Sequence, residues 1–248
     1  RLPLVLRGAR QVGKTWLVRE LAKAHQKTLV ELNLERDPSH RRTFQSNDPR
    51  TILGDLEIAL AKDLDPSRTV LFLDEIQAAP QLFAKLRWFA EEMPELPVVA
   101  AGSLLDLALG GPEFSMPVGR IQYRHLEPMG FAEYLRAHGQ GRLLAGLAGW
   151  SCTHELSATV HAKATEWLER YAMVGGMPAI VALDVGGSSP QTCREAQREL
   201  AATYRDDFGK YASRVPRDTL DAVLLAVVRS IGKKFVYERV GADMKGNQ

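Results

Sequence analysis

Short apolar runs alternate with amphipathic stretches through the first half of the chain. Four segments have the pattern of β-strands, namely residues 2–6, 28–34, 70–73 and 97–101. The continuous apolar runs among them are typical of strands that are buried on both faces of a parallel sheet. Three segments carry apolar side chains at helical spacing, namely residues 15–27, residues 49–64 and the stretch that begins at Pro80.

This alternation of strands and helices predicts an α/β fold, in which a parallel sheet has helices on both faces. Residues 121–126 predict a last strand, and residues 131–138 predict a short helix. The pattern beyond is mostly helical, over residues 153–182 and again over residues 190–228. Ligands of such sheets bind beyond the carboxyl ends of the strands. Three polar motifs follow apolar runs at that end, so they are the candidates for a site.

The first motif is GARQVGKT, which follows the first apolar run and precedes an amphipathic helix. It matches the pattern of a phosphate-binding loop. Two glycines let the backbone curl so that its N–H groups face phosphate oxygens, while a lysine opposes the β- and γ-phosphates and a threonine hydroxyl ligates Mg²⁺. We expect ATP or ADP to contact Gly8, Ala9, Arg10, Gln11, Val12, Gly13, Lys14, Thr15 and Trp16. No Asn-Lys-x-Asp element for guanine occurs, which favours ATP over GTP.

The second motif is the pair Asp74-Glu75 at the end of the run 70–73. An acid in this position is suited to hold Mg²⁺ together with Thr15, and we assign that role to Asp74. The second acid, Glu75, is predicted to act as the base that deprotonates the attacking water. Ser103 follows the third run, and we expect it to lie between this base and the γ-phosphate and to sense hydrolysis.

Composition narrows the class of protein. The chain has 248 residues, of which 45% are hydrophobic and 25% charged, as in a soluble globular protein. A net charge of +2 gives no broad basic surface for nucleic acid. Cys152 and Cys193 lack metal-site spacing, so we expect reduced thiols in a cytoplasmic protein. No apolar run reaches the ~20 residues of a membrane helix, so no membrane partner is expected.

The motifs GARQVGKT, LFLDEIQ and AAGSLL, with the later VGR, LEPMGFAEYL, YAMVGGMP and GKKFVYERVGADMK, together resemble AAA-type ATPases of bacteria and archaea that carry a C-terminal region of unknown function. The resemblance covers nearly the whole chain. It implies a P-loop ATPase domain over residues 1–135, a helical domain over residues 136–228 and the start of a winged-helix unit over residues 229–248. The chain begins without a methionine, and we expect it to be a fragment from which the remainder, including a nuclease-like fold, is missing.

The resemblance also implies partners. ATPases of this kind often complete the site with an arginine from a neighbouring subunit of a homo-oligomer, which neutralises charge in the transition state. Arg120 matches the Gly-Arg of the family, and Arg124 is a nearby alternative. A DNA or protein partner would be bound through the missing C-terminal part.

Three functions fit these residues. The first is Mg²⁺-dependent ATP hydrolysis, with the state of the nucleotide relayed to the helical region. The second is a nucleotide-gated switch that binds DNA or a protein and hydrolyses little ATP. The third is a small-molecule kinase, which would want an arginine-rich lid and would not require Glu75 beside Asp74.

Overall fold

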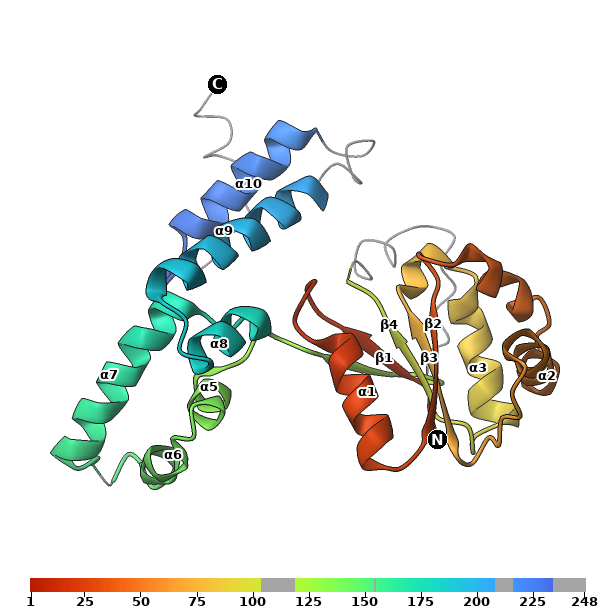
Figure 1. The fold of residues 1–248 in the computed structure, drawn as a ribbon, viewed down its shortest axis with the longest axis horizontal. Helices are drawn as coiled ribbons and strands as arrows, with labels where there is room; N and C mark the ends of the chain where they lie inside the picture. Colours follow the sequence, from red (N-terminus) through yellow and green to blue (C-terminus); the bar gives the residue numbers. More distant parts are fainter. Residues whose placement is uncertain (104–118, 154, 208–215, 234–248) are drawn as a thin grey trace. The chain divides into compact units, whose positions relative to one another are not determined.

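The computed structural model describes residues 1–103, 119–153, 155–207 and 216–233 (Figure 1). The chain divides into two compact units, Arg1–Val181 and Ala182–Gln248. The first unit contains the three polar motifs.

A five-stranded sheet forms the centre of the first unit. Its strands lie in the order β2-β3-β4-β1-β5, and every neighbouring pair is parallel. Their bounds are β1 (Leu4–Arg7), β2 (Thr28–Asn33), β3 (Thr69–Asp74), β4 (Val98–Ala101) and β5 (Gln122–His125). In the register of the sheet, Leu4 lies opposite Val99 on one side and Gln122 on the other. The predicted parallel sheet is confirmed, and its carboxyl edge gathers the ends of β1, β3 and β4.

Helices cover both faces of this sheet (Figure 1), which confirms the predicted fold class. On one face α1 (Lys14–Ala24) packs through Val18 against Phe72. On the other face α2 (Pro49–Leu60) and α3 (Leu82–Glu92) form the larger core with Leu71 and Leu73. Alternate residues of β3 therefore face opposite helices, as the pleat of a strand requires. This burial on both faces explains why the run 70–73 is apolar throughout.

Two short 3₁₀ segments complete the sheet domain. The segment η1 (Pro38–Phe44) lies between β2 and α2, was not predicted from the pattern, and buries Phe44 in the larger core. The segment η2 (Ile76–Ala78) directly follows the acid pair at the end of β3. It turns the chain toward α3.

The rest of the described chain is helical, as predicted. Six helices follow β5 in the described ranges, and Tyr134 in the first of them is buried against the rings of His138, Trp167 and Tyr171. The helices are α5 (Phe131–Ala137), α6 (Gly141–Ala148), α7 (Ala158–Val174), α8 (Pro178–Val185), α9 (Pro190–Asp207) and α10 (Arg217–Arg229). No helix in the described ranges is long and apolar enough to cross a membrane. Most of the predicted winged-helix start, residues 234–248, lies outside the described residues.

Candidate functional site

The loop between β1 and α1 has the curled backbone that its glycines predict. Gly8 has a φ of 142° and Gly13 a φ of 94°, and both values favour glycine over residues with a side chain. A Cβ atom on Gly8 would lie 2.2 Å from the carbonyl oxygen of Leu126, so no larger residue fits there. Gly13 caps the N-terminus of α1 in the left-handed conformation. The loop thus ends at a helix N-terminus, which attracts anions.

Lys14 folds back over this loop. Its Nζ donates to the carbonyl oxygens of Gly8 at 2.8 Å and Ala9 at 2.7 Å. The side chain is buried, and this burial lowers the pKa of the ammonium group, although the nearby Glu75 and Asp74 oppose the shift. A buried positive charge at the centre of the loop is therefore held by backbone dipoles and faces two carboxyl groups.

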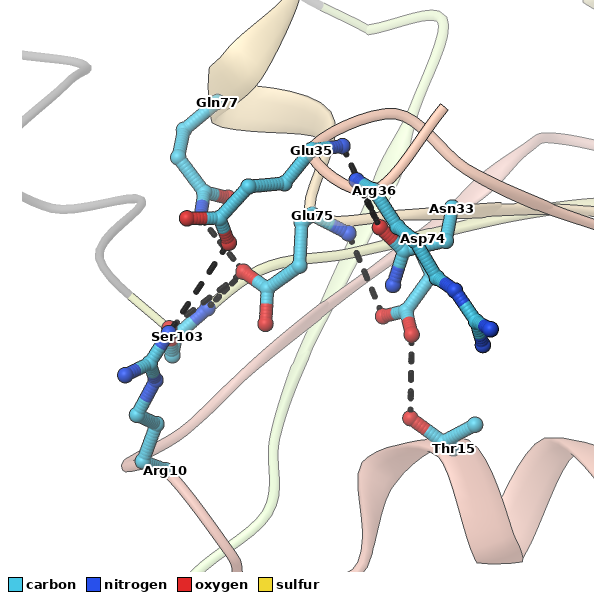
Figure 2. Close-up of polar contacts among 9 residues, drawn as sticks. All are labelled: Arg10, Thr15, Asn33, Glu35, Arg36, Asp74, Glu75, Gln77 and Ser103. Carbon is cyan, nitrogen blue, oxygen red and sulfur yellow. Dashed lines mark hydrogen bonds and ion pairs between the residues drawn. The ribbon is translucent and has the colours of Figure 1, made fainter. Parts of the chain in front are cut away.

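Asp74 meets Thr15 across the gap between β3 and α1 (Figure 2). The hydroxyl of Thr15 donates to Oδ2 of Asp74 at 3.2 Å. Burial raises the pKa of Asp74, and the neighbouring Glu75 carboxylate raises it further. A divalent cation would compensate this buried negative charge, and hydroxyl and carboxylate oxygens are the ligand types that Mg²⁺ prefers. The two residues therefore fit the predicted metal site.

Glu75 is held from one side (Figure 2). Its Oε2 accepts hydrogen bonds from Nε2 of Gln77 at 2.5 Å, from the hydroxyl of Ser103 at 3.3 Å and from the backbone N–H of Ser103 at 3.5 Å. The backbone of Glu75 is left-handed, with a φ of 52°, which is uncommon for a residue with a side chain. Ser103 therefore contacts the carboxylate that we assign as the base.

Lys14, Thr15, Asp74 and Glu75 line one pocket of about 250 Å³ at the carboxyl edge of the sheet. Trp16 lies at its rim and is 66% exposed. The Arg10 guanidinium lies 3.8 Å from the carboxylate of Glu35, which follows β2. The lining residues are Arg10, Gln11, Gly13, Lys14, Thr15, Trp16, Asp74 and Glu75. Of the other predicted contacts, Val12 is buried in the loop.

Arg120 lies elsewhere in the sheet domain. It precedes β5, which runs parallel to β1, so it lies at the amino edge of the sheet and not at the carboxyl edge. Its Nε donates to the carboxylate of Glu91 at 2.6 Å. Arg124, on β5, donates to the carbonyl oxygen of Tyr123. Neither arginine lines the pocket of its own chain. Donation from a neighbouring subunit stays a prediction.

Gln77 belongs to this site although sequence reasoning assigned it no role. The motif LFLDEIQ contains it, but its side chain reaches Glu75 only because η2 turns the chain directly after the acid pair. A polar residue two positions beyond a candidate base, in an expected turn, is the signal that would have identified it.

The sheet domain matches a known family. The family model described as an AAA domain matches residues 1–135, which is more than half of the chain. The chain belongs to this AAA family. A second model, described as a domain of unknown function (DUF8612), matches residues 165–248.

Membership in the AAA family gives the chain a nucleotide-binding, ATPase-like fold. It also confirms the resemblance to AAA-type ATPases with a C-terminal region of unknown function. No curated protein matches the chain. Among solved structures, that of PCH-2 from C. elegans is similar with a TM-score of 0.41 and 12% identity. That match covers 73% of this chain and 52% of PCH-2.

Proposed function

We propose that this AAA domain binds ATP together with Mg²⁺ and hydrolyses it to ADP and phosphate. One observation carries the proposal: a single pocket brings together Lys14, Thr15, Asp74 and Glu75. These are the groups that phosphoryl transfer to water needs, namely a phosphate-binding cation, two metal ligands and a base.

Binding follows from the charges of the site. Lys14 would exchange the carbonyl oxygens of Gly8 and Ala9 for the β- and γ-phosphate oxygens, which are stronger acceptors for a buried ammonium group. Thr15 and Asp74 would hold Mg²⁺, which when bound neutralises charge on the phosphates. The exposed ring of Trp16 at the rim would contact the remainder of the nucleotide.

Hydrolysis requires that a water molecule attack the γ-phosphorus. In our proposal Glu75 accepts a proton from this water while the new O–P bond forms and the bond to the leaving ADP oxygen breaks. The proton later passes from Glu75 to solvent. Ser103 contacts this carboxylate and follows the end of β4 in the chain. The departure of phosphate would therefore change the position of Ser103 and of that strand end.

A relay to the helical region has one contact in its favour. A Cβ atom on Gly13 would lie 4.0 Å from Cγ of Pro178, the first residue of α8, and both residues belong to the first compact unit. A nucleotide bound at Gly13 would therefore lie near the start of α8. We retain the proposal that the ATPase domain spans residues 1–135 and a helical domain spans residues 136–228.

Two substitutions separate binding from hydrolysis. Glu75→Gln removes the base and keeps the shape, so ATP should still bind while single-turnover cleavage falls about 10²- to 10⁴-fold. Lys14→Ala removes the buried cation, so affinity for ATP should fall in calorimetry. The matched control is Glu92→Gln, which makes the same change of charge at an exposed position of α3.

Three results decide the proposal. If calorimetry with magnesium detects no binding of ATP or ADP, the whole proposal is wrong. Normal turnover by the Glu75→Gln protein would remove Glu75 as the base. Tight binding of ATP without cleavage by the unmodified chain at any protein concentration would favour the nucleotide-gated switch.

A further inference from the structure

Gln77 makes a contact that the fold itself does not require. The turn η2 is closed by backbone hydrogen bonds from Ala78 to Glu75 and from Ala79 to Ile76. The side chain of Gln77 takes no part in them and donates instead to Oε2 of Glu75 at 2.5 Å. Stability of the turn therefore does not explain why an amide occupies this position.

The other end of the same amide strengthens this point. Oε1 of Gln77 is buried, and within the described ranges it accepts no hydrogen bond. A buried acceptor without a partner is unfavourable for stability, and an apolar side chain of similar length would avoid that cost. An amide kept at such a cost points to a role in the site.

The arrangement of Glu75 suggests what that role is (Figure 2). Gln77 and Ser103 both donate to Oε2, and no hydrogen bond from the described part of the chain reaches Oε1. Figure 2 shows Oε1 pointing away from Gln77 and Ser103. One oxygen is fixed and the other is left for a reactant.

We propose that Gln77 is a positioning residue, which orients the Glu75 carboxylate so that Oε1 accepts the proton of the attacking water. This inference rests on the proposed function, because it needs Glu75 to act as the base. A glutamate side chain has three rotatable bonds, and a base must lie within hydrogen-bond reach of the proton that it takes. A donor that fixes Oε2 removes most of this freedom before the nucleotide arrives.

The test is Gln77→Met, which keeps the length of the side chain and removes the donor. We expect kcat for ATP hydrolysis to fall about 10- to 100-fold, because small displacements of a catalytic group cost rates of this order. The KM for ATP and the affinity for ADP should change less than about twofold, because Gln77 does not line the pocket. The control is Gln81→Met at an exposed position before α3, which should leave both parameters unchanged.

A double-mutant cycle distinguishes positioning from a general structural effect. In a Glu75→Gln background, Gln77→Met should produce no further loss of rate, because its effect passes through the missing carboxylate. Gln77→Asn keeps the amide on a shorter side chain that does not reach Oε2 of Glu75. Its kcat should therefore also fall, while its affinity for ADP should stay unchanged.

The outcomes separate the two proposals. If both Gln77 variants bind ADP and retain kcat while Glu75→Gln has lost it, the positioning role is wrong and the proposed function stands. If the losses in the cycle add, Gln77 acts independently of Glu75 and the inference is also wrong. A chain that binds ADP but never hydrolyses ATP, even at high protein concentration, overturns both.

Discussion

At the scale of residues, the site concentrates features that a stable fold avoids. Lys14 and Asp74 are charged groups at buried positions, and burial shifts the pKa of each toward its neutral form. Glu75 and Gln11 have left-handed backbones without being glycine. Such costs are typical of sites that await a ligand of complementary charge. A triphosphate with a divalent cation has that complementary charge.

Gly8 offers a prediction at this scale. Gly8→Ala places a methyl group 2.2 Å from the carbonyl oxygen of Leu126 at an unfavourable φ, so we expect the free energy of unfolding to fall by about 2–4 kcal/mol. Gly54→Ala is the matched control, since this glycine lies inside α2 with open space around it and should gain about 0.5–1 kcal/mol. Urea unfolding measures both. Equal effects of the two substitutions would contradict the tight approach at Gly8.

At the scale of elements, a polar cap fixes where α2 begins and so which of its residues enter the core. Asp48 caps α2 by accepting hydrogen bonds from the N–H of Arg50 at 2.9 Å and from the hydroxyl of Thr51 at 2.8 Å. Pro49 occupies the first helical position, where its missing N–H costs nothing. With its start fixed, α2 buries Ile52 and Leu56 under the sheet. The cap therefore supports the face opposite α1.

The cap predicts a dependence on pH. The two donors hold the pKa of Asp48 below its usual value, so its contribution to stability is present above the unfolded pKa, about 3.9, and is lost as pH falls through the folded pKa. Asp48→Ala should lower Tm by about 2–4 °C at pH 7, and the difference from the unmodified chain should shrink below about pH 4. Asp48→Asn keeps an acceptor and is the control. A loss that is equal at both pH values would show that charge plays no part in the cap.

At the scale of the whole molecule, neither Arg120 nor Arg124 lines the pocket of its own chain. Arg120 pairs with Glu91 at the amino edge of the sheet, and Arg124 points to the backbone of β5. Arg10 lines the pocket but lies beside Glu35. If Arg120 completes the site, it does so in a neighbouring copy of the chain.

Turnover against protein concentration tests this arrangement. If Arg120 is donated in trans, the rate per chain should rise with concentration, because association would then complete the site. Arg120→Ala should abolish the rise and lower the maximal rate about 10³-fold, the range for an arginine supplied in trans. Arg124→Ala, on β5, should leave both the rise with concentration and the maximal rate unchanged. A rate that is independent of concentration, together with an unaffected Arg120→Ala protein, would remove the trans arginine.

The sequence by itself determined the elements and the chemistry of the loop. Burial on both faces accounts for the apolar run 70–73 of β3, and the glycines and lysine of the phosphate loop are close in the chain, so their geometry is local. Asp74 and Glu75 directly follow the apolar run 70–73, so the end of this run marks their position in the sequence. Each of these features depends on neighbours a few residues away, which is why the linear pattern contains them.

Only the tertiary structure decided which distant groups meet. β4 lies beside β3, which places Ser103 near Glu75, and β5 runs parallel to β1, which leaves Arg120 at the amino edge of the sheet. The hydrogen bond from Gln77 depends on a left-handed residue at position 75, which no periodicity signals. Such contacts depend on strand order and on backbone dihedral angles. These determine which distant residues meet, and the spacing of residues along the chain does not specify them.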